Sequence, residues 1–124
     1  MRKASHYLLG FAAAALMVPL RAQHITENAG KTYYDSAHTI LKEVWAYKEQ
    51  MTFHPDRPDK MQIQRIRHGS YFKYYRSGKL MVAGKYREGK PEGEWKYYSE
   101  TGEVVKREIY ENGRLVETIQ NDEP

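Results

Sequence analysis

The sequence predicts an all-β protein, an antiparallel meander of repeated β-hairpins that forms a single-layer sheet. Two observations lead to this prediction. Segment 67–90 aligns without a gap on segment 91–114, so that equivalent residues lie 24 positions apart, and a fixed period of this size is typical of repeat architectures. Each unit has two runs rich in aromatic and β-branched residues, which favour strands, separated by glycine-containing turns. Each repeat is therefore expected to be one hairpin.

The aligned residues define the structural positions of the repeat. They are the pairs Gly69 and Gly93, Tyr71 and Trp95, Tyr74 and Tyr98, Gly78 and Gly102, Tyr86 and Tyr110, and Gly89 and Gly113. Stacked repeats should place Tyr71 beside Trp95 and pack the repeated aromatic residues into a thin core. Gly78 and Gly102 follow polar residues and precede strand-like runs, so both are expected to be turn residues with positive φ.

This pattern resembles the variant MORN repeat of bacterial proteins, of the type often labelled YwqK-like antitoxins. The resemblance rests on Gly-x-aromatic-x-x-Tyr-x-x-x-Gly-x-(Leu/Val) followed by Tyr-x-x-Gly, and it covers the two full repeats. It implies sheets of repeated hairpins that act as binding or scaffolding surfaces. It brings no shared catalytic residues.

The first segment has the layout of a secretory signal peptide. Arg2 and Lys3 precede the apolar run 7–20, and Ala22 offers a small residue at the cleavage point. We expect a signal helix in residues 1–22, cleavage near Ala22–Gln23 and a secreted or periplasmic protein. The alternative is an uncleaved anchor, although the apolar run is shorter than the ~20 residues that a spanning helix needs. Cleavage would leave 17 basic and 16 acidic residues, so the basic pI does not indicate nucleic-acid binding.

Residues 23–32 lack periodicity and are expected to be a flexible leader, in which substitution of Gly30 should be nearly silent. A degenerate repeat, 33–66, follows. A helix also fits the spacing of residues 39–50, but Val44, Trp45 and Tyr47 favour a strand. Residues 49–67 are expected to form a protruding hairpin arm, and the prolines of 54–60 to form its turn. The arm is either a binding element or a tolerated surface insertion.

The repeat domain is expected to span 33–118, with repeats 67–90 and 91–114. Its last strand, LVETIQ, would be an edge strand, and residues 119–124 form an acidic tail. Strand alternation predicts that Leu80, Val82, Gly84 and Tyr86 share one face, as do Val104 and Tyr110.

Catalytic and metal-binding patterns are not found in the sequence. Cysteine is absent, and no two of the five histidines lie within four residues of each other. The glycine spacings match neither a nucleophile elbow nor a phosphate-binding loop. We therefore expect no enzyme activity, no metal and no cofactor.

The candidate binding residues are basic and aromatic. Segment 65–90 holds eight basic residues and one acidic residue, and Tyr75 and Tyr97 have no tyrosine at the equivalent repeat position. The candidate set is Arg65, Arg67, Lys73, Tyr75, Arg76 and Tyr97. Export argues against nucleic acid as the partner, so another protein or an anionic envelope surface is expected.

Three functions follow from these observations. The first is an exported binding or scaffold module, supported by the leader and the repeats. The second is an antitoxin-like or immunity inhibitor of a toxin, which the family resemblance implies. The third is an envelope enzyme whose catalytic residues form no recognisable pattern.

Overall fold

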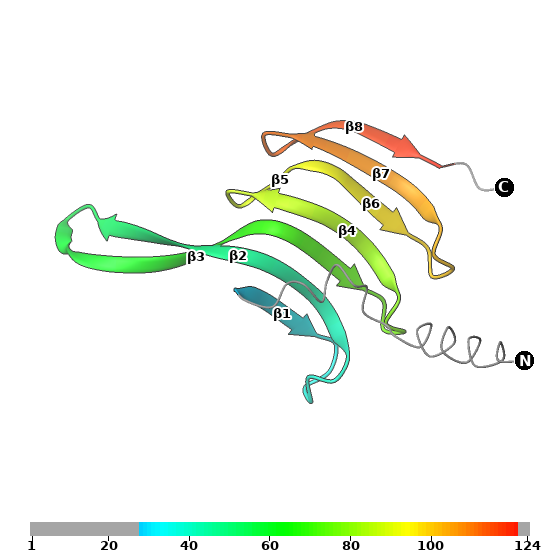
Figure 1. Ribbon diagram of the computed structural model, residues 1–124, viewed down its shortest axis with the longest axis horizontal. Helices are drawn as coiled ribbons and strands as arrows, with labels where there is room; N and C mark the ends of the chain where they lie inside the picture. Colours follow the sequence, from blue (N-terminus) through cyan, green and yellow to red (C-terminus); the bar gives the residue numbers. More distant parts are fainter. Residues whose placement is uncertain (1–27, 122–124) are drawn as a thin grey trace, which may run out of the picture.

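The structure is a computed structural model that describes residues 28–121, and Figure 1 shows its single antiparallel sheet. The strands are β1 (Ala29–Tyr33), β2 (Leu41–His54), β3 (Arg57–Tyr74), β4 (Leu80–Arg87), β5 (Lys90–Pro91), β6 (Gly93–Tyr98), β7 (Val104–Glu111) and β8 (Arg114–Gln120). Their order across the sheet is β1-β2-β3-β4-β6-β7-β8, with the short β5 paired to β4. The predicted all-β meander is confirmed. The expected signal helix, 1–22, lies outside the described residues.

The two full repeats are hairpins with the same register. Lys73 lies opposite Val82 in the β3–β4 hairpin, and Tyr97 lies opposite Lys106 in the β6–β7 hairpin. Each of these residues is matched 24 positions later, so the period in the sequence is also a period of the strand pairing. Both hairpins have a register shift at the same repeat position, between Lys73 and Tyr74 in the first and between Tyr97 and Tyr98 in the second.

Glycine with positive φ closes each of these hairpins, as the sequence predicted. Gly78 has φ of 90° and Gly102 has φ of 92°. The amide of Gly78 donates to the carbonyl of Tyr75, and the amide of Gly102 donates to the carbonyl of Ser99. In the turn of the degenerate repeat, the amide of His38 donates to the carbonyl of Asp35 in the same way, and His38 has φ of 59°. The stacking of His38 on Tyr33, with ring centroids 4.8 Å apart, accompanies this unfavourable conformation.

The sheet has a small core on each face. On one face, which we call the aliphatic face, Val44, Phe72 and Tyr74 form a buried cluster with Ala29, Leu41, Leu80 and Ala83 around it. On the opposite face, which we call the aromatic face, Tyr71, Val82 and Trp95 are buried against Trp45, Met81, Tyr86, Tyr97 and Tyr110. Tyr71 and Trp95 have ring centroids 5.2 Å apart, which confirms their predicted contact. A single layer thus buries residues on both faces by packing large side chains over neighbouring strands.

Strand alternation alone gave the wrong face for two residues. Leu80 was expected with Val82 and Tyr86, but it lies opposite Tyr74 on the aliphatic face. Val104 likewise lies opposite Tyr98, whereas Tyr110 lies opposite Gly93. The cause is the register shift in each hairpin, since one extra residue reverses the side to which the chain beyond it points.

The leader prediction was wrong for residues 29–32, which belong to β1. Gly30 lies opposite Trp45, and a Cβ at Gly30 would come within 2.3 Å of the indole ring. Glycine is required because the ring lies directly over the backbone of β1. Substitution of Gly30 is therefore not expected to be silent.

The predicted arm is confirmed as a protruding hairpin of β2 and β3 (Figure 1). Its turn is shorter than expected, because β3 already begins at Arg57 and includes Pro58. His54 pairs with Arg57, but its neighbour Phe53 pairs with Met61. Pro58 lies between Arg57 and Met61, in an irregular part of this two-stranded ribbon. Proline is tolerated there because an unpaired strand edge requires no amide donor.

Candidate binding surface

Arg67 lies within the aromatic face. Its guanidinium carbon is 4.5 Å from the ring centroid of Trp45, 5.6 Å from that of Tyr71 and 5.2 Å from that of Tyr86. It also donates a hydrogen bond to the hydroxyl of Tyr86 at 3.2 Å. A cation held against three rings contributes to packing. Arg67 is therefore a structural residue of this face, and its charge is only partly available to a partner.

Lys73, Tyr75 and Tyr97 meet at one open groove of about 730 Å³. The groove is also lined by Met81, Val82, Tyr98, Val105, Lys106, Gln120 and Asn121. The register explains the convergence, because β4 pairs with β6 through Val82 and Tyr97 and thereby joins the two repeats. Three residues that the sequence predicted as binding residues thus lie side by side.

Lys106 is a groove residue that the sequence analysis missed. It lies opposite Tyr97, and its ammonium group is 4.1 Å from the centroid of that ring. It occupies the repeat position of Val82, so each hairpin supplies one lysine from a different strand. The alignment of the two repeats contained a signal for Lys106. If Val82 lies opposite Lys73 in the first hairpin, then the residue 24 positions after Val82, which is Lys106, lies opposite Tyr97 in the second hairpin.

Carboxylates accompany both lysines. Glu43 lies opposite Lys73 and accepts hydrogen bonds from the hydroxyls of Tyr71 at 2.6 Å and Thr32 at 2.9 Å. Burial opposes ionisation of Glu43, but these hydrogen bonds and the charges of Arg67 and Lys73 outweigh it, so the pKa of Glu43 is lowered. The carboxylate therefore stays ionised at neutral pH and offsets part of the positive charge.

Glu108 plays the same part in the second repeat. It accepts hydrogen bonds from the hydroxyls of Tyr97 and Tyr110, and Lys106 Nζ lies 3.7 Å from its Oε2. Burial, followed by the hydrogen bond to Glu108 and its charge, raises the pKa of Tyr97 well above its usual value. Tyr97 thus remains a neutral donor, and the groove offers ammonium groups and aromatic rings to a ligand.

Tyr75 has a structural bond that the sequence analysis did not foresee. Its hydroxyl donates to the carbonyl of Tyr98 at 2.7 Å, and the hydroxyl of Tyr34 donates in the same way to the carbonyl of Tyr74 at 2.8 Å. The premise that Tyr75 lacks a counterpart was therefore wrong, since Tyr34 is its counterpart in the degenerate repeat. Ser99 occupies this position in the last repeat.

The remaining candidates lie elsewhere. Arg65 is on the arm, where its guanidinium lies 5.0 Å from the centroid of Tyr47 and its Nε lies 3.3 Å from Glu49. Arg76 is at the β3–β4 turn, over the ring of Tyr34 at 4.8 Å, and lines a separate pocket of about 230 Å³. Residues clustered in the sequence are thus divided among the arm, the groove and a turn.

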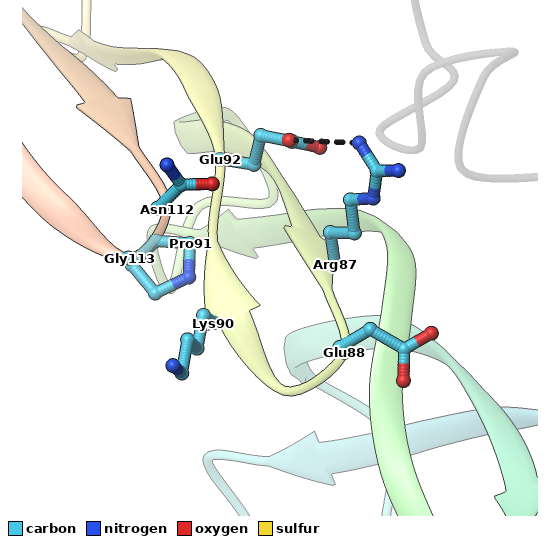
Figure 2. A pocket seen from close by; sticks show the side chains of 7 residues that line it. All are labelled: Arg87, Glu88, Lys90, Pro91, Glu92, Asn112 and Gly113. Carbon is cyan, nitrogen blue, oxygen red and sulfur yellow. Dashed lines mark hydrogen bonds and ion pairs between the residues drawn. The ribbon is translucent and has the colours of Figure 1, made fainter.

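A third cavity, of about 340 Å³, lies between the β4–β5 turn and the β7–β8 turn. Figure 2 shows its lining, in which Arg87 and Glu92 form an ion pair with 3.2 Å between Nη1 and Oε1. The four charged side chains, Arg87, Lys90, Glu88 and Glu92, balance one another. The lining of this cavity favours neither an anionic nor a cationic ligand, so this cavity is a weaker candidate binding site than the groove.

The described residues 28–121 contain no group of three or more His, Asp or Glu side chains that could hold a metal ion. Within the same range, no helix is long and apolar enough to cross a membrane.

No protein-family model matches the chain, and no curated protein matches it.

Proposed function

We propose that this chain is an exported, non-catalytic binding module that captures an acidic segment of another protein or an anionic envelope surface. The observation that carries the proposal is the groove in which Lys73, Tyr75, Tyr97 and Lys106 meet. The signal-peptide pattern of residues 1–22 supports export. The repeated hairpin register supports membership of the variant MORN-repeat type, which remains part of the proposal.

The chemistry of the groove favours an acidic ligand. Two ammonium groups provide attraction over a distance, and the tyrosine rings provide contact area with little loss of side-chain freedom. Glu43 and Glu108 partly neutralise Lys73 and Lys106. The groove therefore favours a ligand whose own groups replace the contacts between these carboxylates and the lysines over a ligand that binds by charge alone. Binding should therefore weaken with salt while retaining a contribution from the rings.

The test is a capture experiment on extracts of the native cell envelope, with tagged protein purified from cells that express the full chain. The double substitution Lys73→Gln and Lys106→Gln should reduce recovery of the captured partner severalfold and flatten the dependence of capture on salt. The matched control is Lys79→Gln and Lys85→Gln, which removes the same charge from two exposed lysines outside the groove. Circular dichroism checks that all variants remain folded.

Equal capture by both double variants would exclude the groove as the site. A captured protein that is toxic when expressed alone would favour the inhibitor function, and turnover of a substrate in the extract would contradict the non-catalytic proposal.

A further inference from the structure

One row of paired residues crosses the sheet from β3 to β8 and follows the groove. Lys73 lies opposite Val82, which in turn lies opposite Tyr97. Tyr97 lies opposite Lys106, and Lys106 lies opposite Gln120. All five of these residues line the groove. The groove therefore runs across the strands, and a ligand that fills it crosses them as well.

The spacing of the strands sets the distance between the two lysines of this row. Lys73 is on β3 and Lys106 is on β7, so the intervening strands β4 and β6 separate them by three strand spacings. Neighbouring strands lie about 4.8 Å apart, and directly paired residues share a face of the sheet. The backbones of the two lysines are therefore about 14 Å apart, and a ligand that reaches both needs two anionic groups at a similar separation.

Both ammonium groups can accept a ligand. The distance of 3.7 Å between Lys106 Nζ and Oε2 of Glu108 is longer than a hydrogen bond, and the Lys106 side chain is 31% exposed. Lys73 forms no ion pair within residues 28–121. The N–H donors of both groups thus remain open to a carboxylate of the ligand, which would form charge-assisted hydrogen bonds.

The part of the groove between the two lysines is largely apolar. Val82 and Tyr97 are the intervening residues of the row. Met81 and Val105 also line the groove. Each of them is the extra residue of the register shift in its hairpin, since Lys73 and Tyr74 pair with residues 82 and 80, and Tyr97 and Tyr98 pair with residues 106 and 104. A ligand therefore gains most from an apolar group placed midway between its two anionic groups.

An extended peptide has this arrangement of groups. Its backbone advances about 3.4 Å per residue and its side chains alternate between two sides, so residues i and i+4 lie on one side about 14 Å apart. Residue i+2 lies between them on the same side. In an α-helix the same distance corresponds to about nine residues, or about two and a half turns, which places the two side chains on opposite sides. The groove thus matches an extended segment and not a helical one.

We propose that the groove binds an extended acidic peptide segment in which two acidic residues four positions apart contact Lys73 and Lys106 and an apolar residue between them contacts Val82 and Tyr97. This inference rests on the proposed function, in which the groove is the binding site, and it specifies the ligand. An anionic bilayer presents headgroups at no fixed spacing and no apolar side chain between them, so the row favours a peptide over a membrane surface.

The first experiment measures binding of fluorescently labelled synthetic peptides by anisotropy, with protein purified from cells that express the full chain. The peptide Asp-Thr-Val-Thr-Asp has the matching spacing, and Thr-Asp-Val-Asp-Thr has the same composition and charge with the acidic residues two positions apart. Both carry blocked termini. The parent should bind the first peptide about fivefold more tightly, because only that peptide forms both charge pairs at once.

The second experiment removes one lysine at a time and reads the ratio of the two affinities. Lys106→Gln should bind both peptides equally, since one remaining lysine cannot distinguish the two spacings. Lys73→Gln should give the same result and serves as an independent variant. The control Lys79→Gln with Lys85→Gln changes exposed lysines outside the groove and should keep the preference of the parent. Circular dichroism checks the fold of each variant.

Equal binding of the two peptides by the parent would overturn the inference, as would an unchanged preference in both single-lysine variants. If the parent shows no preference but capture of the envelope partner still requires Lys73 and Lys106, the proposed function stands and the spacing is wrong. If that capture does not require the two lysines, the groove is not the site. Binding of the parent to vesicles of phosphatidylcholine with phosphatidylglycerol, with neither peptide bound, would assign the groove to a membrane surface and overturn the inference.

Discussion

At the scale of single residues, two tryptophans determine where glycine is required. A Cβ at Gly84 would come within 2.2 Å of the Trp95 ring, and a Cβ at Gly30 would come within 2.3 Å of the Trp45 ring. In both places an indole lies flat over the backbone of the neighbouring strand. This packing lets Trp95 be only 6% exposed in a sheet of one layer. These glycines make room for an aromatic ring, whereas Gly78 and Gly102 provide positive φ.

Gly84→Ala should therefore destabilise the protein by about 2 kcal/mol, the usual cost of forcing an extra carbon into a packed site. Gly30→Ala should cost less, because Trp45 is only partly buried and its ring can move. Gly102→Ala is the matched control: it meets no neighbour within 4 Å, so only backbone strain of about 1 kcal/mol is expected. Urea denaturation measures all three, and equal losses at Gly84 and Gly102 would exclude steric conflict with Trp95.

Asp35 gives a residue-level prediction about pH. It accepts hydrogen bonds from the hydroxyl of Thr39 at 2.6 Å and the amides of Ile40 at 2.8 Å and Thr39 at 3.0 Å. The bond from the Thr39 side chain, followed by that from the Ile40 amide, lowers the pKa of Asp35 from 3.8 to about 2. A depressed pKa in the folded state means that the stabilisation is complete above the unfolded pKa and disappears as the pH falls from about 4 to 2.

Asp35→Asn should therefore remove part of the acid dependence of stability in that window and leave the stability lower at neutral pH. Denaturation midpoints measured across the acidic range test this. A variant whose stability falls with acid as steeply as the parent's would show that the carboxylate of Asp35 is not responsible.

At the scale of elements, tyrosine hydroxyls join each repeat to the next. Tyr34 reaches from the β1–β2 turn to the carbonyl of Tyr74, and Tyr75 reaches from the β3–β4 turn to the carbonyl of Tyr98. The β4–β5 turn makes a further connection at the base of the arm, where the Gly89 amide donates to the Arg67 carbonyl and Glu88 pairs with Lys48. The β1–β2 and β3–β4 hairpins are thus tied at both ends.

Tyr34→Phe and Tyr75→Phe should each cost about 1 kcal/mol, the usual contribution of one hydrogen bond. Their costs should add, because the two bonds join different pairs of hairpins. Tyr98→Phe is the control, since its hydroxyl makes no hydrogen bond within residues 28–121. Thermal unfolding is the measurement, and a Tyr75→Phe variant as stable as the Tyr98→Phe variant would mean that the bond contributes nothing.

At the scale of the whole molecule, a single layer limits how much surface folding removes from water. Only six hydrophobic residues are buried, and no polar or charged residue is buried in the described residues. The buried residues form two small clusters on opposite faces. The repeat domain therefore depends on side chains that pack across neighbouring strands along its length, as other repeat proteins do.

The urea m value should accordingly lie near the lower end of the range for small domains, about 1 kcal/mol per molar, because m grows with the surface exposed on unfolding. An m value typical of a two-layer domain of this length would contradict the single-layer description.

The sequence by itself determined the hairpin repeat, its 24-residue register, the turn glycines, the contact of Tyr71 with Trp95, and the existence of the arm. These features depend on local backbone preferences and on a 24-residue period that is the same in the sequence and in the strand pairing. For the binding surface, the sequence predicted Lys73, Tyr75 and Tyr97, which line one groove, but it missed Lys106 and the bond that holds Tyr75.

Only the tertiary structure decided which face each residue occupies beyond a register shift, because one extra residue reverses the alternation and leaves no mark in composition. It also decided that Gly30 lies beneath Trp45, that Arg67 is held among three rings, and that no third strand supports the outer arm. These properties arise between strands that are distant in sequence. The physical reason is that these properties depend on which strands become neighbours in the sheet. Local preferences specify only which segments form strands and which form turns.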